Sequence, residues 1–91
     1  MELMKYKLVN GEVREKYKLH EFTMGDVEDV EVYMAQPIYE WQQTPAGKFC
    51  MENATEITHH TWLDLPTYTN RVVITGYLSG KQATFWALKK S

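Results

Sequence analysis

The chain has 91 residues, with 10 basic and 12 acidic side chains and a formal net charge of −2. This length suits one small domain and excludes a doubly wound nucleotide-binding fold, a TIM barrel and a two-lobed enzyme. The near balance of charge excludes a global basic field that would collect nucleic acid or an anionic membrane. Hydrophobic residues are 44% and aromatic residues 13% of the chain, which is typical of a globular protein rather than a disordered one.

The alternation of apolar and polar residues predicts two strands, at residues 3–9 and 12–24. Asn10-Gly11 lies between them and predicts a tight hairpin, because both residue types tolerate a positive φ. The apolar face of the second strand switches near His20-Glu21, which predicts a β-bulge. The alternative is a strand that is buried on opposite faces at its two ends.

A short helical turn is expected over residues 27–35, with Asp26 as its N-cap. Valine is frequent in this stretch and has a low helix propensity, so extended structure remains the alternative.

The main helical segment is expected to begin at Pro37, because proline suits the first position of a helix. Thr44-Pro45 has the same signature, a capping hydroxyl followed by proline. The sequence therefore predicts two helical pieces, about 37–43 and 45–53, that are kinked or broken at Thr44. The expected apolar anchors of this segment are Trp41 and Phe49.

Residues 54–70 show no clean period and are expected to form a long loop. Residues 71–78 and 83–89 are expected to form a second hairpin around a turn at Ser79-Gly80-Lys81. The expected core positions are Val72, Ile74, Leu78, Trp86 and Leu88. The order of hairpin, helical segment and hairpin predicts a single α+β domain over residues 1–91, in which an antiparallel sheet of about four strands packs on one kinked or broken helical segment.

Five carboxylates gather in eleven residues, at Glu21, Asp26, Glu28, Asp29 and Glu31. The regular ligand series of a calcium-binding loop is absent, and the ordinary interpretation is a solvated turn that caps a helix. Carboxylates and aromatic side chains together are also what a protein interface uses. The leading hypothesis is therefore a protein-binding surface, and its members are Asp26, Glu28, Asp29, Glu31, Tyr33 and Tyr39.

Basic residues cluster in the first hairpin, at Lys5, Lys7, Arg14, Lys16 and Lys18. Lysines on strands commonly protect a sheet edge, which is the ordinary interpretation. The alternative function is a nucleic-acid-binding module, in which these cations contact phosphates and sheet aromatics stack on bases.

A third hypothesis is a metal or thiol centre that involves Cys50, His59 and His60, with Asp64 or His20 as additional ligands. Adjacent residues point apart in a strand, so the two neighbouring histidines are poorly placed to share one metal. Cys50 lies between Phe49 and Met51, which favours a small buried hydrophobic residue over a nucleophile. We therefore predict no catalytic residue, no metal and no cofactor.

The stretches FTMGDVED (22–29), AQPIYEWQQT (35–44), GKF (47–49) and TFWALK (84–89) resemble small proteins encoded by tailed bacteriophages. Proteins of that kind have no assigned function, so the resemblance supplies no catalytic or binding residue. This chain departs from that pattern at two points, because the resemblance leads us to expect a proline near Val30 and an acidic residue in place of Pro45. The resemblance implies expression inside an infected bacterium, as an accessory factor or a minor structural component.

The single cysteine excludes an internal disulfide, and small secreted domains usually need one. Residues 1–9 are too polar for a signal peptide, and no apolar run approaches the length of a membrane span. We therefore expect a cytoplasmic protein with no membrane segment. It would act through a host or phage protein, or through a second copy of itself.

Overall fold

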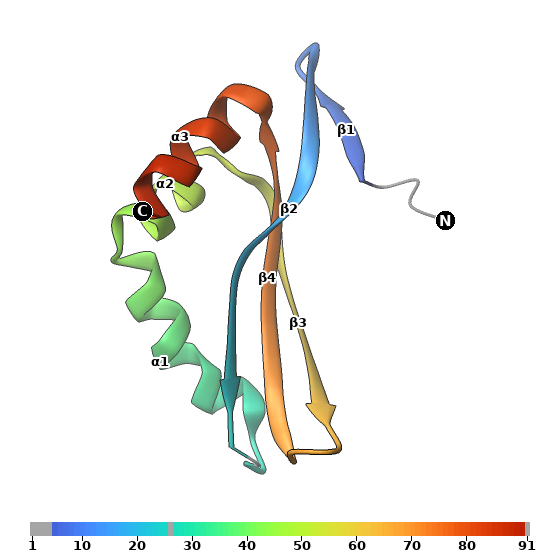
Figure 1. Ribbon diagram of the computed structural model, residues 1–91, viewed down its shortest axis with the longest axis vertical. Helices are drawn as coiled ribbons and strands as arrows, with labels where there is room; N and C mark the ends of the chain where they lie inside the picture. The colour runs from blue at the N-terminus through green and yellow to red at the C-terminus, as the bar shows by residue number, and fades with distance from the viewer. Residues whose placement is uncertain (1–4, 26, 91) are drawn as a thin grey trace.

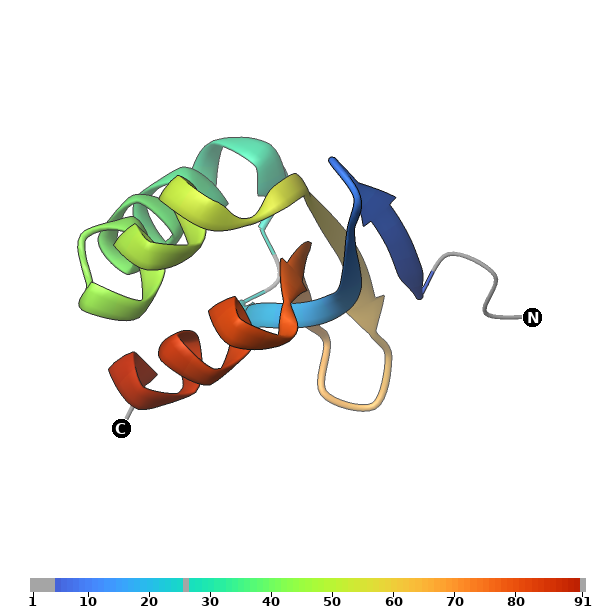
Figure 2. The same cartoon turned by 90° about the horizontal axis from the view of Figure 1, so that it is seen from above.

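The computed structural model describes residues 5–25 and 27–90 as a four-stranded antiparallel sheet with three helices (Figure 1). The elements in chain order are β1 (Tyr6–Val9), β2 (Glu12–Met24), α1 (Val30–Gln42), α2 (Pro45–Asn53), β3 (Thr55–Asp64), β4 (Thr69–Ser79) and α3 (Gly80–Lys90). The strand order in the sheet is β1-β2-β4-β3. All three helices lie on one face of the sheet, as the view from above shows (Figure 2). The predicted α+β class and the sheet of about four strands are confirmed.

The hairpin of β1 and β2 forms as predicted, with positive φ values at Asn10 (52°) and Gly11 (78°). The bulge in β2 is also confirmed, because the register between β2 and β4 shifts between Lys18 and His20. This extra residue lets the apolar side chains on both halves of β2 face the helices. Tyr17, before the bulge, packs on Trp86 of α3, and His20, after it, packs on α1.

Helix α1 joins two pieces that were predicted separately, the helical turn over residues 27–35 and the helix that starts at Pro37, and it begins at Val30. Asp29 is its N-cap, with a carboxylate oxygen 3.4 Å from the Val32 nitrogen that donates to it. The predicted cap, Asp26, lies outside the described residues. Pro37 lies inside α1 rather than at the first position of a helix, so the predicted break before Pro37 was wrong. Met34 and Trp41 are buried on either side of this proline, and their packing holds the helix together across the missing backbone bond.

The predicted break at Thr44 is confirmed, because α1 ends at Gln42 and α2 begins at Pro45. The Thr44 hydroxyl accepts a hydrogen bond from the Gly47 nitrogen at 3.0 Å and donates one to the Trp41 carbonyl oxygen at 2.6 Å. One side chain therefore caps the start of α2 and ties it to the end of α1.

Two predicted elements were wrong. Residues 54–70 are not a loop, because β3 occupies most of them and pairs with β4. Residues 83–89 are not a strand, because they lie within α3. This helix starts with a reciprocal pair of hydrogen bonds, in which the Gln82 nitrogen donates to the Ser79 hydroxyl at 3.2 Å and the Ser79 nitrogen donates to the Gln82 side chain at 3.0 Å. The second hairpin is therefore β3–β4.

The core lies between the sheet and the helices. Its central cluster consists of Leu19, Trp41, Cys50, Ile74, Leu78 and Trp86. Most predicted core positions are confirmed: Ile74, Leu78 and Trp86 belong to this cluster, and Val72 is fully buried outside it. Leu88 is the exception, with 67% of its surface exposed, because residues two apart on a helix point to nearly opposite sides and Trp86 takes the inward one. Phe49 is only partly buried.

Candidate functional site

Glu28, Asp29 and Glu31, which we call the acidic turn, lie at the start of α1, whereas Glu21 of the same predicted cluster lies on β2. Glu28 precedes the helix and is exposed, and Asp29 is the N-cap. Glu31 lies in the first turn, where its carboxylate is 3.6 Å from the Nε2 atom of His59 on β3. That contact is an ion pair only when the imidazole is protonated. The acidic turn is therefore anchored to α1 by its cap and lies against one edge of the sheet.

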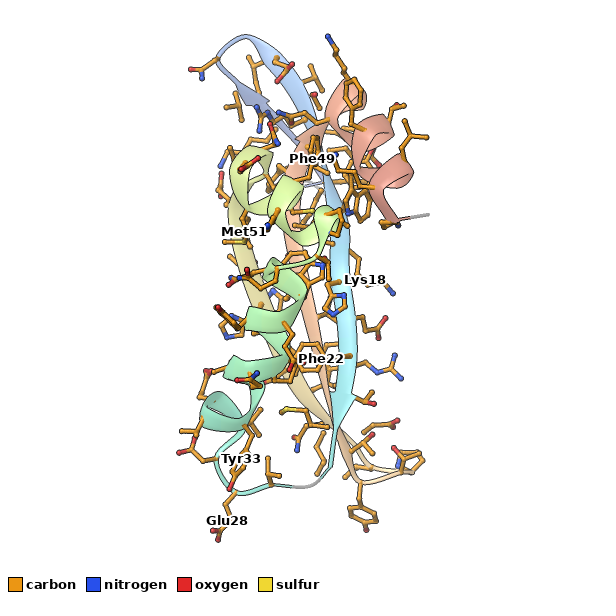
Figure 3. All side chains as sticks on the ribbon, turned by 90° about the vertical axis from the view of Figure 1, so that its left-hand side faces the viewer. Lys18, Phe22, Glu28, Tyr33, Phe49 and Met51 are labelled. Carbon is orange, nitrogen blue, oxygen red and sulfur yellow. The ribbon has the colours of Figure 1, made fainter. Side chains whose placement is uncertain are left out.

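The turn between β3 and β4 lies at the same end of the molecule as the start of α1 (Figure 1). The side chain of Asn70, at the start of β4, donates a hydrogen bond at 2.9 Å to the Gly25 carbonyl oxygen, which joins these two regions. Figure 3 shows Glu28 and Tyr33 at this end. The exposed fractions are 60% for Tyr33, 64% for Leu65 and 63% for Tyr68.

We call this region the acidic end; it consists of Glu28, Asp29, Glu31, Tyr33, Leu65 and Tyr68. Sequence reasoning found its α1 residues and missed Leu65 and Tyr68. Those two lie in a segment that was expected to be an unstructured loop, and only the pairing of β3 with β4 places their turn at the same end of the molecule as the start of α1. Tyr39 is also exposed, but it lies nearly two turns further along α1 and is not part of this end.

The cations of the first hairpin are mostly paired with carboxylates of the same chain. Lys18 contacts Glu21 at 2.7 Å, Lys5 contacts Glu15 at 3.6 Å, and Lys7 is paired with Glu56. Arg14 contacts Glu12 at 3.2 Å and the Asn53 carbonyl oxygen at 2.9 Å. Lys16 alone of the five has no ion pair within residues 5–25 and 27–90.

Glu21 shows how this pairing reduces the charge on the face of the sheet that has no helices. Its carboxylate accepts hydrogen bonds from both Lys18 and Arg71, at 2.7 Å each. The hydrogen bond from Lys18 is the largest cause that lowers the pKa of Glu21. A nucleic-acid phosphate would have to compete with such internal partners at most of the predicted cations, which disfavours the nucleic-acid alternative.

The residues of the metal or thiol hypothesis are not assembled into a centre. His59 is in register with Ile74 and His60 with Val73, so their side chains lie on opposite faces of the sheet. Cys50 is fully buried, and burial raises the pKa of its thiol to about 11. Over the described part of the chain, no group of three or more His, Cys, Asp or Glu residues is arranged to hold a metal ion.

Two hollows lie on the helical side of the sheet. The smaller, about 130 Å³, lies between α1, α2 and β3, and its lining includes Ile38, Met51 and His59. The larger, about 360 Å³, lies between β2, the corner of α1 and α2, and the end of α3. Sequence reasoning missed the larger hollow because its lining comes from several separate elements.

Comparison with protein-family models, curated proteins and solved structures finds no match to this chain. In the residues that the structure describes, no helix has the length and hydrophobicity needed to cross a membrane.

Proposed function

We propose that this chain is a small non-catalytic interaction protein of the tailed-bacteriophage type, and that it binds a protein partner through the acidic end. The observation that supports the proposal is the convergence of two separate segments. The start of α1 brings carboxylates and Tyr33, and the β3–β4 turn brings Leu65 and Tyr68. Exposed aromatic and aliphatic side chains beside charged ones are typical of a binding interface.

The chemistry of the acidic end defines the partner. Tyr33 and Tyr68 offer large apolar surfaces that each carry one polar group, which suits an anchor that enters a pocket on another protein. Glu28 and Glu31 are exposed and add negative charge at the same end of the molecule. We therefore infer a partner with an apolar pocket bordered by basic residues. This partner is a host or phage protein, or a second copy of this chain, and the proposed setting is the cytoplasm of an infected bacterium.

The test is a pull-down from bacterial lysate with the full chain, combined with light scattering to detect self-association. The variant is Tyr33→Ser with Tyr68→Asn, and asparagine is chosen because Tyr68 has a φ of 53° that asparagine tolerates. The matched control is Tyr6→Ser with Leu88→Ser, two exposed side chains outside the acidic end. We expect the wild type and the control to recover one stoichiometric partner or to self-associate, and the variant to lose this. The proposal would be contradicted if the wild type recovered no partner and did not self-associate. It would also be contradicted if the variant recovered as much partner as the wild type.

A further inference from the structure

The larger hollow is an open groove between the ends of two helices, and we call it the α2–α3 groove. Its floor is Leu19, His20 and Trp41, one wall is residues 44–46 at the start of α2, and the other wall is Lys89 and Lys90 at the end of α3. Figure 3 shows α2 and α3 side by side over β2. Its volume of about 360 Å³ falls within the range of small-ligand pockets, roughly 300–1,000 Å³, whereas the hollow near His59 is too small.

The walls of the groove carry positive charge. No residue of the lining is acidic, and α3 contains three lysines and no carboxylate. Lys90 lies over the Trp86 ring, with its Nζ atom 3.9 Å from the ring centroid, and the Nζ atom of Lys89 is 6.0 Å from the Phe49 centroid. Aromatic rings position an ammonium group without cancelling its charge.

These lysines differ from the cations of the first hairpin. Neither Lys89 nor Lys90 forms an ion pair with a carboxylate among residues 5–25 and 27–90, whereas most of the hairpin cations do. The start of α2 on one wall carries the positive end of a helix dipole and the end of α3 on the other wall carries a negative end, so the net positive charge of the groove comes from Lys89 and Lys90. Within the described chain, this groove is therefore the place where free cationic groups and a cavity coincide.

The floor of the groove is mostly apolar and contains a pair of stacked rings. Leu19 and Trp41 are buried, and the His20 ring stacks on Trp41 at a centroid distance of 5.3 Å and an interplanar angle of 11°. Burial lowers the pKa of His20, so its imidazole is neutral at pH 7 and adds no charge to the floor. A ligand that used the whole groove would need an anionic group at one end and an apolar body at the other.

We propose that the α2–α3 groove binds a small organic anion. Its carboxylate or phosphate group lies between the ammonium groups of Lys89 and Lys90, and its flat or aliphatic body lies along the floor, chiefly on the partly exposed His20 ring that covers Trp41. Trp41 is at the opposite end of α1 from Glu31, roughly 15 Å along the helix axis, so this site is separate from the acidic end. The proposal does not depend on the proposed protein partner.

The test is a titration followed by backbone amide NMR shifts, with four probes. Phenyl phosphate and benzoate carry both features of the ligand, inorganic phosphate carries the charge alone, and benzyl alcohol carries the ring alone. We expect saturable shifts around Leu19, Ala46 and Lys89 with phenyl phosphate, benzoate or both, and binding about tenfold weaker or worse for the other two probes. The comparison of phenyl phosphate with benzoate identifies the preferred anionic group.

The variant for this test is Lys89→Gln with Lys90→Gln, and the matched control is Lys48→Gln with Lys81→Gln. Both remove two charges from exposed positions, the first pair on α3 and the control pair on α2 and α3, but only the first removes them from the groove. We expect the first pair to weaken binding about tenfold or more and the control to leave it within about twofold. Absence of saturable binding by both organic anions, equal loss in both variants, or shifts that map outside the groove would overturn the proposal.

Discussion

Gly47→Ala should destabilise the protein, although alanine normally favours a helix. Gly47 is the third residue of α2. In an exposed helix interior, this change would stabilise by about 1 kcal/mol. Here a Cβ atom would overlap the Trp41 carbonyl oxygen, and it would lie 2.6 Å from the Trp41 carbonyl carbon and 3.0 Å from the Gln42 Cα atom. These are backbone atoms, so no side-chain rotation can relieve the overlap and the corner between α1 and α2 must open.

The magnitude follows from what this corner holds together. Overpacking of this kind costs about 1–3 kcal/mol. Opening the corner also displaces the Trp41 carbonyl oxygen, which accepts from the Thr44 hydroxyl at 2.6 Å, and loss of such a hydrogen bond costs about 1 kcal/mol more. After the gain in helix propensity, the net destabilisation is about 1–3 kcal/mol. For a chain of this size, that lowers Tm by about 4–24 °C.

Thermal and urea unfolding, followed by circular dichroism, would measure this difference. The matched control is Gly80→Ala at the first position of α3, where a Cβ atom would meet nothing within 4 Å. We expect the control to change the free energy of unfolding by less than about 1 kcal/mol. If Gly47→Ala had a Tm equal to or above that of the wild type, the reasoning about the corner would be refuted.

Three further predictions concern single side chains. Thr44→Ala should lower the free energy of unfolding by about 1 kcal/mol, measured by urea denaturation, because it removes the cap of α2; an unchanged midpoint would contradict this. Burial raises the pKa of the Cys50 thiol to about 11, so a thiol reagent at pH 8 should react slowly with the folded protein and quickly with the protein unfolded in urea. Equal reaction rates in the two conditions would show that the thiol is accessible in the folded protein. Burial lowers the pKa of His20 in the folded state, so the unfolded chain binds the proton more readily and the free energy of unfolding should fall as the pH drops from about 7 through that lowered pKa. His20→Phe should reduce this slope of unfolding free energy against pH, and an unchanged slope would exclude His20 as its source.

Local signals in the sequence were sufficient for several elements. Asn10-Gly11 predicted a tight turn, and the switch in apolar face near His20 predicted a bulge, with a strand buried on opposite faces as the alternative. Thr44-Pro45 predicted a new helix start, with a kink or a break at Thr44, because the hydroxyl caps a helix and proline suits its first position. Each of these signals acts through residues that are close in the chain, so no tertiary contact was needed to interpret it.

The two wrong elements have different causes. β3 is an edge strand with β4 as its single neighbour, and most of its side chains are exposed on both faces, so it lacks the alternation that marks a half-buried strand. In α3, Trp86 and Leu88 imitate the alternation of a strand. The capping pair of Ser79 and Gln82 was the local signal for a helix, and it was overlooked.

The sequence by itself determined the class of the domain, the first hairpin, the Thr44 break and most of the core, because turn, cap and periodicity signals are local. Only the tertiary structure decided which surfaces are available for binding. The cations of the first hairpin form ion pairs with carboxylates of the same hairpin and of β3, whereas Lys89 and Lys90 line a groove without a carboxylate partner among the described residues. The acidic turn and the β3–β4 turn lie at the same end of the molecule because the sheet order brings together segments that are distant in the chain. Such surfaces depend on distances between elements, which no local pattern of residues specifies.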